Sequence, residues 1–232
     1  MEGICPRVGR PLLAAPVRRW AVALLAGSTF LVVVLGVLFA HQVRADPFDR
    51  TLDAPVIAWS GGHPGLALRL ASPGSLVPAA VLSAAVVIAC LLAGRLNGAV
   101  LALVAVPVSV GLDERLFKPL FGRTYLGNLV YPSGHTTATF ALAATLAVLL
   151  LVPPQPSKTK MLRVAIPAAA CLLGCIVAAA VVGLRWHYFT DTVAGAAVGI
   201  GTVCGLALML DLTVVRSWLA RATRRVATAE EG

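Results

Sequence analysis

The stretch VAIPAAACLLGCIVAAAVVGL, residues Val164–Leu184, contains 21 residues and no charged side chain. About 20 apolar residues in a helix span the hydrocarbon core of a bilayer, because each residue advances the helix by about 1.5 Å. Five other apolar runs have a similar character: Trp20–Ala40, Leu76–Leu92, Gly98–Leu112, Thr136–Val152 and Thr192–Val214. Together the six runs predict an all-α integral membrane protein, a bundle of six transmembrane helices.

The composition supports the same interpretation and divides the chain into parts. Hydrophobic residues make up 59% of the 232 residues and charged residues only 12%, which excludes an ordinary water-soluble domain. We expect a basic cytoplasmic tail at residues 1–19, a membrane domain at 20–214 and a second cytoplasmic tail at 215–232. The first apolar run is too long for a cleaved signal peptide, so we interpret it as a retained anchor.

The basic residues predict the orientation of the chain. With the N-terminus inside, 12 of the 19 lysines and arginines fall on the cytoplasmic side, as the positive-inside rule favours. Both termini are then cytoplasmic. Arginine outnumbers lysine 16 to 3, which indicates a bacterial genome and hence a bacterial plasma membrane. Because the basic residues are scattered through short loops and tails, they predict contact with anionic lipid headgroups rather than with nucleic acid.

Seven basic residues remain on the extracytoplasmic side, where cations need a separate explanation. Four of the seven lie next to two histidine motifs: Arg115, Lys118, Arg123 and Arg185. An anionic substrate is the simplest reason for them, so we expect the functional site on that side.

The segment His41–Ser75, on the same side, is rich in proline and glycine. Its four prolines stand at positions 47, 55, 64 and 73, and this density argues against a continuous helix. Nothing in its spacing assigns it a role.

His187 and Asp191 lie between the fifth and sixth apolar runs. Ionisable residues against a membrane span cost free energy, so they are candidates for function. A spacing of four predicts that both side chains share one helix face, where the carboxylate accepts the imidazole N–H and leaves the other ring nitrogen as a nucleophile. The alternative is that Thr190 or Asp191 caps the last membrane helix, and the two interpretations are compatible.

The tetrapeptide Pro132-Ser133-Gly134-His135 precedes the fourth apolar run. Unpaired N–H groups and the positive end of the dipole at a helix start favour an anion, and glycine lets a phosphate approach the backbone. His135 in the first turn is placed to donate a proton to a leaving-group oxygen. The alternative is an ordinary helix start with Ser133 as its cap and an interfacial histidine.

Three cations complete the candidate site. Lys118 offers a point charge and Arg123 a bidentate fork for phosphate oxygens. Arg185 lies two residues from His187. For Lys118 and Arg123 the alternative is a basic pair that merely flanks the membrane.

The acidic residues near this cluster do not predict a metal site. Asp113 and Glu114 are adjacent rather than spaced to share an ion, and we expect them to pair with Arg115 or Lys118 and to end the third apolar run early. The sequence also lacks a P-loop, a dinucleotide fingerprint and a Gly-x-Ser-x-Gly elbow.

These motifs resemble those of the type 2 phosphatidic acid phosphatase superfamily, which includes bacterial undecaprenyl pyrophosphate phosphatases and, among soluble relatives, vanadium haloperoxidases. The family pattern is K-x6-R-P, then P-S-G-H, then S-R-x5-H-x3-D. The middle motif matches in full at Pro132 to His135, and His187 and Asp191 match the last one.

Two of the motifs depart from the family pattern. Lys118 and Arg123 are separated by four residues rather than six, and Thr124 stands where proline follows in the family. In the last motif, Ala180-Val181 occupies the place of the serine and arginine. Arg185 lies one helical turn after Val181, so we hypothesise that it supplies the missing charge.

The resemblance implies a mechanism and a set of site residues. His187 attacks phosphorus and becomes a phosphohistidine, Asp191 orients it, and His135 protonates the departing lipid oxygen. The groups implied to hold the phosphoryl oxygens are Lys118, Arg123, Ser133 and the backbone N–H of Gly134, with Arg185 as an addition. Members of the family need no metal, so no cofactor is expected.

The leading interpretation is a membrane lipid phosphatase that acts at the extracytoplasmic face. The alternative is a catalytically weakened relative that binds lipid phosphates without turnover, and a transporter or purely structural six-helix protein is a third class. Undecaprenyl pyrophosphate or another polyprenyl phosphate suits an outward-facing site that recycles cell-envelope carriers. Phosphatidic acid and phosphatidylglycerol phosphate stay open as substrates.

Overall fold

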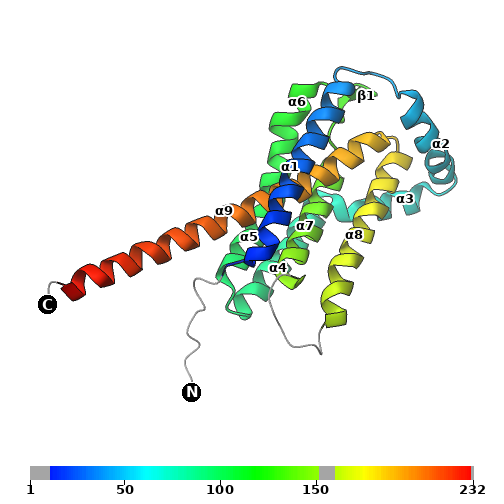
Figure 1. The fold of residues 1–232 in the computed structure, drawn as a ribbon. Helices are drawn as coiled ribbons and strands as arrows, with labels where there is room; N and C mark the ends of the chain where they lie inside the picture. The colour runs from blue at the N-terminus through cyan, green and yellow to red at the C-terminus, as the bar shows by residue number, and fades with distance from the viewer. Residues whose placement is uncertain (1–10, 152–159, 231–232) are drawn as a thin grey trace.

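A computed structural model describes residues 11–151 and 160–230, which fold into a helical bundle with one short hairpin (Figure 1). The elements in chain order are α1 (Ala15–Leu38), α2 (Pro47–Gly62), α3 (Pro64–Ala71), η1 (Ser72–Gly74), α4 (Leu76–Leu92), α5 (Leu96–Leu112), η2 (Asp113–Phe117), α6 (Lys118–Phe121), β1 (Thr124–Tyr125), β2 (Asn128–Leu129), α7 (Gly134–Leu151), α8 (Lys160–Gly183) and α9 (Phe189–Glu230). The all-α bundle predicted from the sequence is confirmed.

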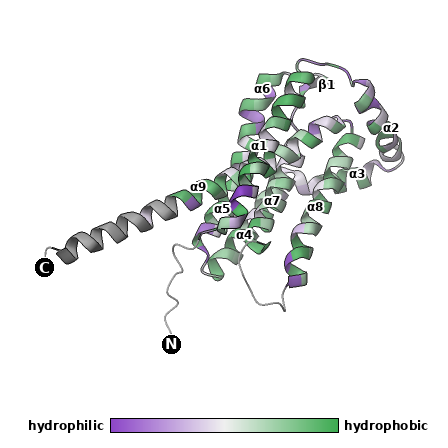
Figure 2. Ribbon diagram, viewed as in Figure 1, coloured by the Kyte–Doolittle hydropathy of each residue, from purple (hydrophilic) through white to green (hydrophobic). Residues whose placement is uncertain are grey.

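Five helices of the described chain are long and apolar enough to cross a membrane, and their ribbons are mainly hydrophobic (Figure 2). They are Ala15–Leu38, Leu96–Phe121, Gly134–Leu151, Lys160–Gly183 and Phe189–Leu212. The predicted run Leu76–Leu92 is α4, residue for residue, but it reaches spanning length only together with Pro64–Gly74, from which it bends by 44°. The six predicted spans therefore appear as five continuous helices and one bent pair of helices.

Helix α5 ends at Leu112, where the third apolar run was expected to end before Asp113 and Glu114, but helical structure continues beyond it. The chain continues helically as the π-helix η2 and then α6. Asp113 is fully buried against the start of α7, and Glu114 pairs with Lys118 one turn later. Glu114 is compensated by this ion pair. Neither carboxylate oxygen of Asp113 has a hydrogen-bond partner among the described residues, so its expected pairing with Arg115 or Lys118 is wrong.

Close helix packing places the start of α7 against the start of α9. Helix α7 packs against α5, α8 and α9, and α9 also packs against α1. A Cβ atom added to Gly195 would lie 2.5 Å from the Ser133 carbonyl oxygen, and one added to Gly199 would lie 2.6 Å from the Thr137 carbonyl oxygen. Only glycine permits this approach, which is the small-residue contact common between membrane helices.

The proline-rich segment before α4 is more helical than expected. As predicted it forms no continuous helix, because α2 and α3 are separated at His63. Pro47 and Pro64 each stand in the first turn of a helix, where the missing N–H costs nothing, and the Asp46 carboxylate accepts the Asp49 N–H at 2.8 Å. Helix α2 packs against α8, at the end of the bundle where β1 also lies (Figure 1).

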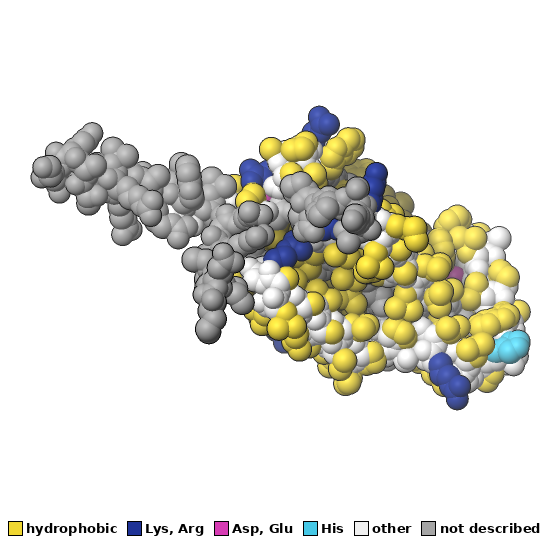
Figure 3. All heavy atoms as spheres, turned by 90° about the horizontal axis from the view of Figure 1, so that it is seen from below, with side chains coloured by type: hydrophobic (Ala, Val, Ile, Leu, Met, Phe, Trp, Pro, Cys, Tyr) yellow, Lys and Arg dark blue, Asp and Glu magenta, His cyan; other side chains and the backbone are white. Residues whose placement is uncertain are grey.

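The surface carries large apolar side chains over much of its area. The face seen from below is covered mainly by hydrophobic side chains (Figure 3). Phe30 on α1, Leu92 on α4 and Met161 on α8 are all strongly exposed. Such a surface fits hydrocarbon rather than water.

The predicted tails are described only in part. Residues 1–10 of the tail at 1–19 lie outside the described residues, as do residues 152–159 of the connector before α8. At the other end α9 continues as a helix to Glu230, through most of the tail at 215–232, and residues 231–232 lie outside.

Candidate active site

A left-handed turn between α8 and α9 presents His187. Arg185 adopts a φ of 60°, its N–H donates to the Val182 carbonyl at 2.9 Å, and the Trp186 N–H donates to the Val181 carbonyl at 3.0 Å. These two bonds form a Schellman motif, which ends a helix and is usually built on glycine. A residue with a side chain in this conformation is strained, and such residues cluster at functional sites.

The imidazole of His187 is held by a backbone carbonyl. Its Nδ1 lies 2.8 Å from the Val130 oxygen, and the Val130 N–H donates in turn to the Arg123 carbonyl at 3.0 Å, across the base of the β1–β2 hairpin. A carbonyl oxygen only accepts, so Nδ1 carries the proton and Nε2 keeps its lone pair.

His187 is neutral at physiological pH. Burial lowers the pKa of its imidazole to about 3, and the positive charges of Lys118 and His135 act in the same direction. The hydrogen bond to Val130 opposes this shift only in part. His187 is thus a neutral imidazole with a fixed tautomer, and Lys118 and His135 are near enough to act on it electrostatically.

The expected contact between Asp191 and His187 is wrong. Helix α9 begins at Phe189, so His187 precedes the helix and the spacing of four does not place the two side chains on one helix face. Asp191 instead accepts the Tyr188 N–H at 2.9 Å and an Arg123 Nη1–H at 2.6 Å. The alternative interpretation, in which Asp191 caps the last membrane helix, describes this geometry.

Arg123 lies at the centre of a buried ionic network. Its Nη1 donates to Asp191 and its Nη2 to Asp49, each at 2.6 Å, and none of the three side chains is exposed. The guanidinium also stacks on the rings of Phe39 and Tyr188, with its carbon 4.5 and 4.3 Å from the ring centroids. Arg123 therefore has carboxylate partners in place of the phosphoryl oxygens expected for it.

Two carboxylates of α2 accept hydrogen bonds from the first N–H groups of α9. The sequence did not reveal this contact. Asp49 accepts the Thr190 N–H at 3.0 Å, and Asp53 accepts the Phe189 N–H at 3.1 Å. These N–H groups have no partner within their own helix. The spacing of four between Asp49 and Asp53 was the one sequence feature that could have indicated a joint role, because it places both carboxylates on one face of a helix.

His135 lies in the first turn of α7, as predicted, and is held from two sides. Its Nε2 is 3.4 Å from the Ser75 hydroxyl oxygen, at the bend between η1 and α4. Its ring centroid lies 5.4 Å from that of Trp186, the neighbour of His187. The histidine motifs thus meet through Trp186, and Ser75 is a positioning residue that the sequence did not reveal.

Ser133 and Gly134 stand at the start of α7 beside acidic side chains. Ser133 is buried, and its N–H donates to the Asp191 carbonyl at 3.0 Å. A Cβ atom on Gly134 would lie 3.0 Å from a Glu114 oxygen and 3.2 Å from an Asp113 oxygen. Both carboxylates therefore lie at the end of α7 that favours an anion.

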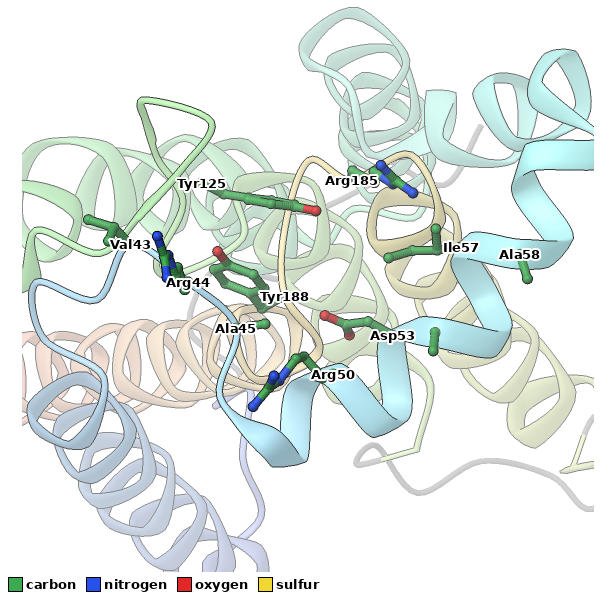
Figure 4. A pocket seen from close by; sticks show the side chains of 11 residues that line it. Val43, Arg44, Ala45, Arg50, Asp53, Ile57, Ala58, Tyr125, Arg185 and Tyr188 are labelled. Atoms are coloured by element: carbon green, nitrogen blue, oxygen red, sulfur yellow. The ribbon is translucent and has the colours of Figure 1, made fainter.

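Lys118 is paired with one of these carboxylates. Its Nζ lies 2.5 Å from Glu114 Oε1, which confirms the pairing expected for Glu114. A phosphate that reached Lys118 would compete with Glu114 for it. Arg185, by contrast, is exposed and lines a pocket with Tyr125 and Tyr188 (Figure 4).

Among residues 11–151 and 160–230, no three histidine, cysteine, aspartate or glutamate side chains are arranged to hold a metal ion.

Comparison with known proteins gives one match. A sequence model described as the PAP2 superfamily matches residues 19–213, a range that includes both histidine motifs. No curated protein and no solved structure matches the chain.

Proposed function

The chain belongs to the PAP2 superfamily, whose members are phosphatases, and we propose that it hydrolyses a lipid phosphate or a polyprenyl phosphate or pyrophosphate through a phosphohistidine. The match confirms the family predicted from the motifs. The lipid substrate and the covalent intermediate are the proposal.

One observation carries the proposal: His187 is a buried, neutral imidazole with Nδ1–H bound to the Val130 carbonyl and an unprotonated Nε2. A neutral imidazole is the nucleophilic form, and fixing one nitrogen aims the other. Lys118 and His135 act on the same ring, so a phosphoryl group bound there would be near positive charge.

The proposed reaction has two steps. In the first, His187 Nε2 forms a bond to phosphorus, the bond from phosphorus to the lipid oxygen breaks, and His135 gives its proton to that oxygen. In the second, water attacks phosphorus while His135 takes a proton from it, and phosphate leaves His187.

The proposed phosphoryl contacts are Lys118, Ser133 and the Gly134 N–H, with Arg185 as a further charge. Asp191 keeps a part in the site, because it caps the start of α9 that follows His187. Its proposed role is therefore that of a positioning residue, without a direct hydrogen bond to His187.

The proposed location is a bacterial plasma membrane, with the site at the extracytoplasmic face and both termini in the cytoplasm. Helix α2, β1 and the α8–α9 turn lie at one end of the bundle, and α1 begins at the other (Figure 1). The distribution of basic residues between the two sides supports this orientation.

A weakened relative that binds lipid phosphates without turnover is the second candidate. It is favoured by the pairing of Arg123 with Asp49 and Asp191 and of Lys118 with Glu114, which leaves fewer free cations for phosphate.

A phosphate-release assay separates the two candidates. Purified protein in detergent, with a chelator present, is incubated with phosphatidic acid, phosphatidylglycerol phosphate and undecaprenyl pyrophosphate. We expect release of inorganic phosphate from at least one of them. Binding of all three without release would contradict hydrolysis and support the weakened relative.

A further inference from the structure

A pocket of about 700 Å³ lies against α2 and is lined by Arg185 and Tyr188, which stand close to His187 in the chain (Figure 4). One wall comes from the connection into α2 and from α2 itself, and the other from β1 and the α8–α9 turn. The charged and aromatic residues that line it are Arg44, Arg50, Asp53, Tyr125, Arg185 and Tyr188. The rest of the lining is apolar and includes Val43 and Ile57.

The charge of this pocket is strongly positive. Three arginines line it and only one carboxylate, that of Asp53. Within the described chain, no carboxylate lies within ion-pair distance of Arg44, Arg50 or Arg185. Elsewhere in the site, Arg123 and Lys118 are neutralised by acidic partners. Positive charge is thus uncompensated in this pocket, which favours an anion.

A hydrogen-bond donor is also unused at the wall of the pocket. Tyr188 is 2% exposed, and its hydroxyl has no hydrogen-bond partner among the described residues. Burial raises the pKa of Tyr188 to about 12, so the hydroxyl keeps its proton and can donate it in a hydrogen bond. A buried polar group without a partner costs free energy, and a bound oxyanion would relieve that cost.

The pocket and the nucleophile are adjacent in the chain, and Arg185, proposed above as a further charge for the phosphoryl group, is the one cation that belongs to both. Arg185 and Tyr188 flank His187 in the chain and line the pocket, whereas Lys118 and His135 act on His187 and do not line it. A substrate with one phosphate fills only the site at His187. We propose that Arg44 and Arg50, with Arg185 shared between the two sites, form a second anion subsite, which holds an anionic group of the substrate other than the phosphate being hydrolysed.

This inference rests on the proposed phosphatase function and narrows its substrate class. The substrate would carry a phosphomonoester and, a few atoms away, a second anionic group such as a phosphodiester. The apolar lining suits the short carbon linker between two such groups.

A matched pair of substrates tests the subsite. Phosphatidic acid and phosphatidylglycerol phosphate share the phosphomonoester, and only the second carries an additional phosphodiester. In the Arg44→Gln/Arg50→Gln protein, we expect kcat/KM for the doubly anionic lipid to fall about tenfold or more relative to kcat/KM for phosphatidic acid. Arg69→Gln removes an exposed arginine of α3 that does not line the pocket, and should leave this ratio unchanged.

An unchanged ratio in the double variant, or the same change in Arg69→Gln, would overturn the subsite. Binding of glycerophosphoglycerol, a soluble phosphodiester, is measured by calorimetry on the same proteins. This measurement tests the second anion subsite even if the protein hydrolyses no lipid. We expect the double variant to bind it at least about tenfold more weakly than wild type. Inorganic phosphate that displaces it with equal affinity would indicate a free-phosphate site instead, and would contradict a headgroup role.

The Asp53 carboxylate gives this binding a characteristic pH dependence. Burial raises its pKa to about 6, and repulsion from Asp49 and Asp46 adds to the rise, while the Phe189 N–H and Arg123 oppose it. Above pH 6 Asp53 is ionised and repels an anion in the pocket, and below pH 6 it is neutral.

We therefore expect the affinity for glycerophosphoglycerol to rise as the pH falls through about 6. The phosphodiester keeps its single charge over this range, so the change in affinity comes from titration of the protein and not of the ligand. Calorimetric titrations at pH 5 and pH 8 measure it. Asp53→Asn should bind with the high affinity at both pH values, and a step that persists in this variant would contradict the assignment to Asp53.

Discussion

The His187→Asn protein is expected to remain folded and to lose phosphate release by a factor on the order of a thousand or more. An asparagine amide can reproduce the hydrogen bond from His187 Nδ1 to the Val130 carbonyl, but it has no equivalent of Nε2. The substitution thus removes the proposed nucleophile and keeps the contact that anchors it. Release of inorganic phosphate by the purified variant, relative to wild type, measures the loss.

The control for this experiment is His63→Asn, which changes an exposed histidine at the end of α2 in the same way. It should retain wild-type activity, and both variants should melt at the wild-type temperature. Brief incubation with radiolabelled substrate should trap acid-labile label on wild type and on His63→Asn, and none on His187→Asn. Retention of more than about a tenth of the activity by a folded His187→Asn protein would show that another group attacks phosphorus.

The fold was predictable from the sequence wherever one physical effect dominated. Uncharged runs of spanning length have few alternatives to a transmembrane helix, and the bounds of α4 were predicted residue for residue. The helical continuation beyond Leu112, as the π-helix η2 and then α6, was not predictable in this way. Local charge predicted an end there, whereas the structure buries Asp113 against α7 and pairs Glu114 with Lys118.

The candidate site was predictable as a set of residues but not as a set of contacts. The sequence placed His187 on a helix because nothing in it indicates that Arg185 adopts a left-handed conformation, normally the role of glycine. That turn moves His187 off α9 and toward Val130, a partner 57 residues away. Contacts across such separations depend on packing, which no local pattern encodes.

In the proline-rich segment His41–Ser75, too, the sequence predicted the local structure but not the distant contacts. Proline density predicted a break in the helix, and α2 and α3 are indeed separated at His63. The same prolines start helices when they occupy the first turn, and α2 then carries Asp49 and Asp53 to the start of α9, about 140 residues later in the chain. The segment is therefore part of the site's support rather than a connector.

Arg123→Met should be the most destabilising single change in this support. It removes the only cation that the structure places against Asp49 and Asp191, among the described residues, and leaves two fully buried carboxylates unpaired. Breaking a buried ion pair by removing one partner costs about 3–5 kcal/mol. At about 2–4 °C per kcal/mol for a chain of this size, the melting temperature should fall by roughly 6–20 °C. Circular dichroism at 222 nm in detergent measures the shift, and Arg69→Met, an exposed arginine, is the control.

The triple variant Arg123→Met/Asp49→Asn/Asp191→Asn tests whether the cost comes from uncompensated charge. Asparagine oxygens can still accept the Thr190 and Tyr188 N–H groups, so α9 keeps its caps while the buried charges disappear. Replacing a whole buried ionic cluster is often neutral, whereas breaking it is not. We therefore expect the triple variant to recover most of the lost melting temperature. If it melts as low as Arg123→Met, the stacking of the guanidinium between Phe39 and Tyr188, rather than its charge, stabilises this end of the bundle.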